Sequence, residues 1–161
     1  IYEGTTAIQA NDLVGRKTAR DGGRVAKAIA GQVAATETEL ARHDSAAARS
    51  MAMRLRAARE AFEEVVDFIA GNSKASPNAV FAGSVPYLML AGNLMCGWQL
   101  ARALIVAEDQ LADGIGDSDF LRAKIVTARF YAEHLLSKVP GARDAIVEGA
   151  ESVTGLALAA F

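Results

Sequence analysis

Residues 45–71, SAAARSMAMRLRAAREAFEEVVDFIAG, contain the clearest structural signal in the chain. Apolar residues recur there at alternating steps of three and four positions: Ala48, Met51, Leu55, Ala58, Phe62, Val65 and Ile69. This spacing is typical of an α-helix that buries one stripe and leaves its other side in water. Asp44 or Ser45 is available as the N-terminal cap. The stretch therefore predicts a long amphipathic helix within a bundle.

Patterns on both sides of this helix predict further helices. One is expected to begin after Thr5 or Thr6, as its cap, and to run to about Lys17. Another is expected over about residues 23–42, after a break at residues 21–23, and its predicted inner stripe is Val25, Ile29, Val33, Thr36 and Leu40. Gly71 to Asn78 is predicted to be a loop, and a short helical turn is expected at about residues 79–83.

The second half of the chain predicts a strongly apolar helix followed by a more amphipathic one. The first begins with a Ser84 cap, ends near residues 114–116 and is expected to be the most buried helix; its predicted inner stripe includes Leu90, Leu94, Trp98, Ala101 and Ile105. The second begins at Asp117 or Ser118 and is expected to stop at Pro140-Gly141; its predicted stripe is Leu121, Ile125, Ala128, Ala132, Leu135 and Val139. A short last segment ends in the apolar residues 155–161, which are expected to dock on this domain or on a neighbour.

Composition agrees with a helical chain. Of the 161 residues, 34 are Ala, the best helix former and a poor strand residue, and only 6% are aromatic. We therefore expect an all-α fold, a helical bundle of about five to six helices with up-down packing.

Charge and hydropathy exclude some partners. The net charge is -2, and the basic clusters around Arg16 and Arg59 are interrupted by acidic residues, so they read as solvated helix faces and no nucleic-acid partner is expected. Residues 75–100 lack charged side chains, but Pro and Gly interrupt them, so a core helix is expected and no membrane span. Cys96 lies within this run and is expected to be a small buried apolar residue.

The usual templates for metal and nucleophilic sites do not match. There is no Glu-x-x-His pair and no pair of Cys residues, and His43 and His134 have no carboxylate at ligand spacing, so no metal site is expected. No phosphate-binding Walker motif and no Gly-x-Ser-x-Gly motif are present.

The first seventeen residues, IYEGTTAIQANDLVGRK, stand apart from the helical patterns. They place the carboxylate of Glu3 beside Gly4, directly before the hydroxyls of Thr5 and Thr6 at an expected helix start. Gly4 permits close approach to the backbone, and amide groups and hydroxyls at a helix start suit an anionic phosphate. A simple N-capping turn with a surface Glu accounts for the same residues, and physical reasoning alone leaves both interpretations open.

This segment resembles the Tyr-Glu-Gly-Thr motif near the C-terminal end of the catalytic core of acyl-CoA dehydrogenases. The continuation, residues 8–17, is similar to that of the large bacterial members, which carry an additional C-terminal helical domain. The resemblance implies that residues 1–22 end the catalytic core and that residues 23–161 are the appended helical bundle. It also implies that the chain is a C-terminal part of a longer enzyme.

The resemblance implies a function for each motif residue. These enzymes oxidise an acyl-CoA to its trans-2-enoyl-CoA and pass a hydride to FAD. Glu3 matches the base that removes the α-proton, and Tyr2 and Gly4 match substrate-binding positions at the thioester. Thr5, Thr6 and Ala7 match the stretch that contacts FAD, although Ala7 stands where the medium-chain type has Gln.

Further expectations follow from the same resemblance. The partners are an acyl-CoA substrate and an electron-transferring flavoprotein, the assembly is a homodimer or tetramer, and the location is cytoplasmic because no signal-peptide pattern opens the chain. The isolated chain is expected to be inactive and structural. Two alternatives are a helical interaction or oligomerisation module, and a small-molecule binding bundle whose pocket is lined by Tyr87, Met89, Met95 and Trp98.

Overall fold

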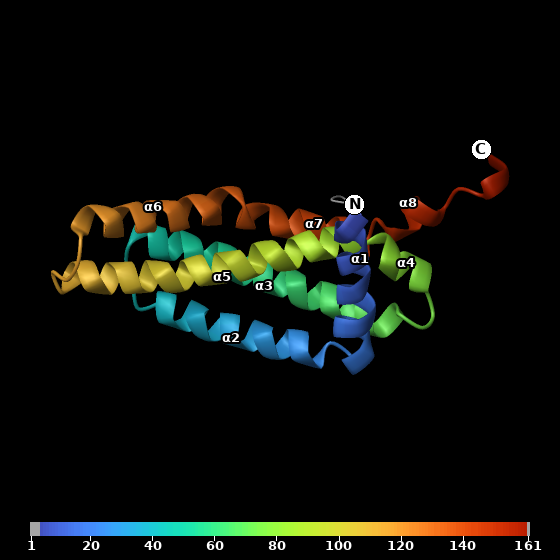
Figure 1. The fold of residues 1–161 in the computed structure, drawn as a ribbon, viewed down its shortest axis with the longest axis horizontal. Coiled ribbons are helices and arrows are strands. Elements are labelled where there is room, and N and C mark those ends of the chain that lie inside the picture. The colour runs from blue at the N-terminus through green and yellow to red at the C-terminus, as the bar shows by residue number, and fades with distance from the viewer. Residues whose placement is uncertain (1–3, 161) are drawn as a thin grey trace.

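The computed structural model describes residues 4–160, and every regular element in that range is helical. Four long helices form the bundle: α2 (Arg24–Leu40), α3 (Ala46–Asn72), α5 (Ser84–Ala112) and α6 (Ser118–His134). They run alternately in opposite directions along the long axis of the molecule (Figure 1). Helices α3 and α5 contact each other and both outer helices, so they form the centre. This confirms the all-α bundle with up-down packing.

Shorter elements complete the two ends of the chain. Helix α1 (Gly4–Asp12) continues into a π-helix (Leu13–Thr18) and a 3-10 turn (Ala19–Asp21), and it crosses one end of α5 (Figure 1). Helices α4 (Pro77–Ala82), α7 (Val139–Val147) and α8 (Ala150–Thr154) lie at the same end. Residues 4–160 thus form eight α-helices, and the short ones account for the excess over the predicted five or six.

Helix α3 follows the sequence prediction closely. All seven residues of its predicted stripe, from Ala48 to Ile69, are buried. Ser45 caps the helix, because its Oγ accepts a hydrogen bond of 2.9 Å from the backbone N–H of Ala48. Such a cap stabilises a helix by about 1 kcal/mol.

The predicted break before α2 is a capped left-handed turn. Gly22 and Gly23 have φ values of +66° and +79°, which favour glycine over other residues. The Asp21 carboxylate accepts hydrogen bonds from the N–H groups of Gly23 and Val25, each 3.1 Å long, and so satisfies the start of α2. Further along α2, the predicted stripe residues Val33, Thr36 and Leu40 are buried. Val25 is exposed and Ala26 is buried in its place, so the prediction for Val25 was wrong.

Helix α5 is central, but it is not the most buried helix. Leu90, Leu94 and Ala101 are buried as predicted, whereas Trp98 and Ile105 are half-buried. Helix α3 contributes more buried residues to the core than α5 does. Ser84 is the first residue of the helix and makes no capping hydrogen bond, which corrects its predicted role.

The outward side of α5 is uncharged over most of its length. Among residues 4–160, α5 is the one helix whose length and composition would suffice to cross a membrane. Core helices of globular proteins meet the same criterion, and α5 contacts α1, α2, α3, α6 and α7. Cys96 is exposed on this helix, contrary to the expectation of a buried apolar residue.

The predicted fifth helix divides into two. Asp117 caps α6 through hydrogen bonds to the N–H groups of Asp119 and Phe120. A 3-10 turn (Leu136–Lys138) then tightens the backbone, so that Leu136 is buried where Leu135 was predicted. Pro140 lies in the first turn of α7 and does not end the helix, because a first-turn residue needs no N–H donor.

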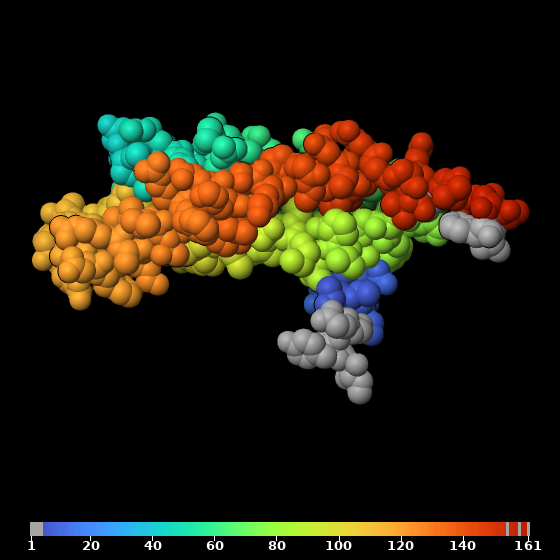
Figure 2. All heavy atoms as spheres, turned by 90° about the horizontal axis from the view of Figure 1, so that it is seen from above, coloured from blue at the N-terminus to red at the C-terminus, as the bar shows by residue number. Residues whose placement is uncertain are grey.

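The C-terminal segment leads away from the bundle. Helix α8 packs against α4, and the residues that follow extend outward (Figures 1 and 2). Leu156 is 66% exposed. The described part of the apolar end therefore does not dock on this domain, and Phe161 lies outside the described residues.

Candidate functional site

The motif segment falls partly within the described structure. Gly4, Thr5, Thr6 and Ala7 form the first described turn of α1. The side chains of Thr5, Thr6 and Ala7 are exposed, and the two threonines lie within the helix, which corrects their predicted capping role. The predicted substrate residue Tyr2 and the predicted base Glu3 lie outside the described residues.

Helix α1 holds this turn away from the core. Ala10 and Val14 are buried and anchor the segment, whereas the residues before them face outward. The helix stands out from the side of the bundle, on the α5 side (Figure 2). The first described turn contains no acidic residue. The exposed side chains of this turn are therefore accessible from outside the bundle.

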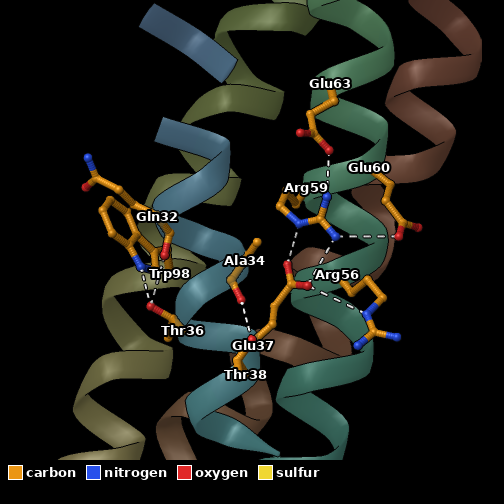
Figure 3. A network of polar contacts seen from close by, with 10 residues as sticks. All are labelled: Gln32, Ala34, Thr36, Glu37, Thr38, Arg56, Arg59, Glu60, Glu63 and Trp98. Atoms are coloured by element: carbon orange, nitrogen blue, oxygen red, sulfur yellow. Dashed lines mark hydrogen bonds and ion pairs between the residues drawn. The ribbon is translucent and has the colours of Figure 1, made fainter. Parts of the chain in front are cut away.

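A polar network joins α2 to α3 (Figure 3). Glu37, on α2, is only 5% exposed, and its two carboxylate oxygens accept hydrogen bonds of 2.7 and 3.2 Å from Arg59 of α3. Arg59 also donates a 2.6 Å bond to Glu63, and Arg56 lies 3.6 Å from Glu37. The hydrogen bonds that Arg59 donates to Glu37 raise the pKa of Arg59 above its usual value. Arg59 was predicted to lie on a solvated face, and that prediction was wrong.

A second polar cluster joins the α2–α3 connection to α5. Ser45 Oγ donates a 2.5 Å hydrogen bond to Glu108 Oε1, and His43 Nδ1 lies 2.9 Å from Glu108 Oε2. The fold thus gives His43 a carboxylate partner that sequence spacing did not reveal. The serine contacts the carboxylate and not the imidazole. Nucleophilic catalysis requires the serine proton to pass to a base such as the imidazole. This arrangement instead links the α2–α3 connection to α5.

Metal coordination has no structural basis within residues 4–160. No group of three or more His, Cys, Asp or Glu residues in that range is arranged to hold a metal ion. His134 makes a ring contact with Phe130, with centroids 4.5 Å apart. This exposed histidine therefore packs against a side chain of its own helix.

The residues of the predicted small-molecule pocket divide into two groups. Tyr87 and Met95 line an apolar hollow of about 210 Å³ between the π-helix, α2, α3 and α5. Met89 is 57% exposed on another side of α5, and Trp98 donates a 2.8 Å hydrogen bond to Thr36 of α2. Tyr87 shares a 3.0 Å hydrogen bond with Thr18, and burial raises the pKa of its phenol.

These observations define an antiparallel helical bundle domain with a protruding N-terminal helix. The family model described as "Acetyl-CoA dehydrogenase C-terminal like" matches residues 24–157. The chain therefore belongs to the family of acyl-CoA dehydrogenase C-terminal domains, as the N-terminal motif led us to expect.

Individual relatives agree with this assignment. The chain is 49% identical over 153 residues, 95% of its length, to 3-methylmercaptopropionyl-CoA dehydrogenase of Ruegeria pomeroyi. It is 32% identical over its whole length to the broad-specificity linear acyl-CoA dehydrogenase FadE5 of Mycobacterium tuberculosis. It is 31% identical over 88% of its length to butyryl-CoA dehydrogenase of Syntrophomonas wolfei. The matches cover 26%, 27% and 23% of those proteins, so the chain spans about a quarter of the relatives' length.

Proposed function

We propose that the chain is the C-terminal part of a flavin-dependent acyl-CoA dehydrogenase that oxidises acyl-CoA to trans-2-enoyl-CoA. The observation that carries this proposal is the 49% identity over 95% of the chain to an acyl-CoA dehydrogenase. The match to FadE5 covers the whole chain and so includes the motif segment. Residues 1–22 are proposed to end the catalytic core and residues 23–161 to form the appended domain, in agreement with a family match that begins at residue 24.

Glu3 is proposed as the base that removes the proton from the carbon next to the thioester carbonyl. A carboxylate suits this step when burial beside an apolar acyl chain raises its pKa toward neutral pH. Tyr2 and Gly4 are proposed to contact the thioester end of the substrate. Gly4 offers no side chain that would keep a substrate from the backbone.

Thr5, Thr6 and Ala7 are proposed to contact FAD, whose flavin accepts the hydride when it is bound. The residues present fit such a group, because the first described turn of α1 exposes two hydroxyls and contains no acidic side chain. Helix starts attract anionic groups such as phosphates through their N–H groups. The protruding position of α1 leaves this turn accessible from outside the bundle (Figure 2).

The bundle itself is proposed to be a structural domain that is inactive alone. Residues 4–160 form no strand, and a proton-abstracting residue without an oriented substrate and flavin gives no useful rate. In the longer protein, the proposed partners are acyl-CoA, an electron-transferring flavoprotein and further copies in a homodimer or tetramer. The proposed location is cytoplasmic.

The alternative is a helical interaction module without catalysis. Large apolar side chains exposed on α6, among them Phe120, Val126 and Phe130, are the observation that favours it. A visible spectrum of the longer protein that contains this chain separates the two functions. We expect a bound flavin whose absorbance is bleached when acyl-CoAs of different length are added without oxygen. A protein that holds no flavin would overturn the enzyme proposal and favour the interaction module.

A further inference from the structure

We propose that the apolar hollow between the π-helix, α2, α3 and α5 binds a small organic anion with an apolar body of about six carbons. The hollow has a volume of about 210 Å³. An apolar cavity of about 150 Å³ in another protein stays dry and binds benzene. The space in this domain is therefore large enough for a ligand of that size.

Two of the helices that line the hollow contribute small residues to it. Ala26 of α2 and Ala91 of α5 line it beside larger apolar side chains, including Leu13, Ile29 and Phe62. The hollow is partly open to solvent, because Val25 in its lining is 52% exposed, so a ligand can enter it from outside. Apolar lining favours an apolar ligand body, because the ligand and the walls are removed from water together.

The walls are held in place by hydrogen bonds and backbone geometry. Thr18 and Tyr87 are each 1% exposed, and their 3.0 Å hydrogen bond ties the π-helix to α5 at the edge of the hollow. The π-helix supplies Leu13, Lys17 and Thr18 to the lining. Such helices are rare, and they occur frequently at functional sites. The hollow is thus a preformed space and does not require the helices to separate.

The charge of the ligand follows from Lys17. This is the one charged residue among those that line the hollow. Its side chain is 65% exposed, and its ammonium is 4.0 Å from Asp12, which leaves it room for a second anionic partner. Lysine side chains place their methylenes along apolar surfaces while the ammonium stays in water. An apolar body inside and a carboxylate at the rim match this arrangement, and a cationic head would be repelled.

Methionine methyl signals can locate the bound ligand, because methionines lie both inside and outside the hollow. In spectra of the methionine methyl groups of the 161-residue chain, hexanoate is expected to shift Met95, which lines the hollow, in a saturable manner. Met53 and Met89 are each 57% exposed and lie outside it, so they serve as internal controls. Hexylamine, which has the same chain with a positive charge, is expected to bind more weakly than hexanoate. Equal shifts at all exposed methionines, or equal binding of the two compounds, would overturn the proposal.

Matched variants locate the site. Ala91→Leu is expected to fill the hollow and abolish the Met95 shift, whereas Ala103→Leu, on the same helix but outside the hollow, is expected to leave it unchanged. Lys17→Gln is expected to weaken hexanoate binding about two- to fivefold, the range for an exposed ion pair, without changing the binding of hexanol. Lys124→Gln is the charge control. Wild-type binding by a folded Ala91→Leu, or an unchanged affinity of Lys17→Gln for hexanoate, would contradict the proposal, which does not depend on the proposed enzyme function.

Discussion

Replacing Arg59 with Met is expected to destabilise the bundle strongly, although Arg59 belongs to a helix face rich in charged residues. The reason is Glu37, which is 5% exposed and receives two hydrogen bonds from the Arg59 guanidinium. Arg59 itself is only 15% exposed. The substitution keeps much of the apolar stem but removes the fork of N–H donors, so a carboxylate is left buried without its main partner.

The magnitude follows from burial and from the neighbouring charges. Removing one partner of a buried ion pair costs about 3–5 kcal/mol, because the other charge remains out of water. The exposed side chain of Arg56 lies 3.6 Å from Glu37 and still offsets part of the buried negative charge. We therefore expect a loss of about 3 kcal/mol in the free energy of unfolding, at the lower end of that range. The double variant Glu37→Met with Arg59→Met is expected to recover most of this loss, since no buried charge then remains.

Urea denaturation followed by circular dichroism measures these differences as shifts of the midpoint at constant slope. The matched control is Arg129→Met, which breaks the exposed i,i+4 pair with Glu133 and is expected to cost about 0.5 kcal/mol or less. If Arg59→Met costs no more than Arg129→Met, the Glu37–Arg59 pair does not hold α2 on α3 as described. A double variant as unstable as the sum of its parts would likewise refute the reasoning.

Three further predictions test packing, titration and capping. Gly97→Ala is expected to destabilise the fold by about 1–2 kcal/mol in thermal unfolding, because the new methyl group would lie 2.6 Å from Leu136; Gly92→Ala, on the same helix but facing open space, is expected to stabilise it by up to about 1 kcal/mol. Burial and the neighbouring Cys96 raise the pKa of Tyr131 to about 12. The unfolded chain loses this proton near pH 10, so stability falls between about pH 10 and 12. Tyr131→Phe should make the urea midpoint less dependent on pH in that window. Ser45→Ala is expected to cost about 1 kcal/mol or more by urea denaturation, since it removes the cap of α3; no change would contradict the capping role.

Much of the fold could be predicted from periodicity because the local rules and the tertiary packing agree there. In α3, all seven stripe residues predicted from the alternating three- and four-residue steps, from Ala48 to Ile69, are buried, and Ala61 and Val66 are buried beside them. Glycines in the sequence also indicated where helices end. Gly114 and Gly116, at the end of α5, have left-handed φ values of +67° and +85°. Errors arose where the backbone departs from regular α-helix. Val25 is exposed directly after the left-handed turn before α2, and Leu136 is buried in place of Leu135 at the 3-10 turn after α6.

The polar contacts could not be predicted because they join residues far apart in the sequence, and of the predicted pocket residues only Tyr87 and Met95 line the hollow. Glu37 and Arg59 are 22 positions apart, and Ser45 and Glu108 are 63 apart. Tyr87 contacts Thr18, the last residue of the π-helix, across 69 positions. For the motif segment, sequence resemblance assigned roles to the residues, whereas a helix start alone did not distinguish a cofactor site from a plain surface turn. The roles of Tyr2 and Glu3 stay predictions.

The measurement that tests the account most directly is anaerobic reduction of the longer protein by acyl-CoA, with Glu3→Gln compared against Glu39→Gln. Glu39 is exposed near the end of α2 and has no proposed part in the reaction, so it controls for the loss of a carboxylate. We predict that acyl-CoA bleaches the flavin of the wild type and of Glu39→Gln, and that Glu3→Gln retains its flavin but is not bleached. A Glu3→Gln protein that binds flavin and is bleached at the wild-type rate would contradict the assignment of Glu3 as the base.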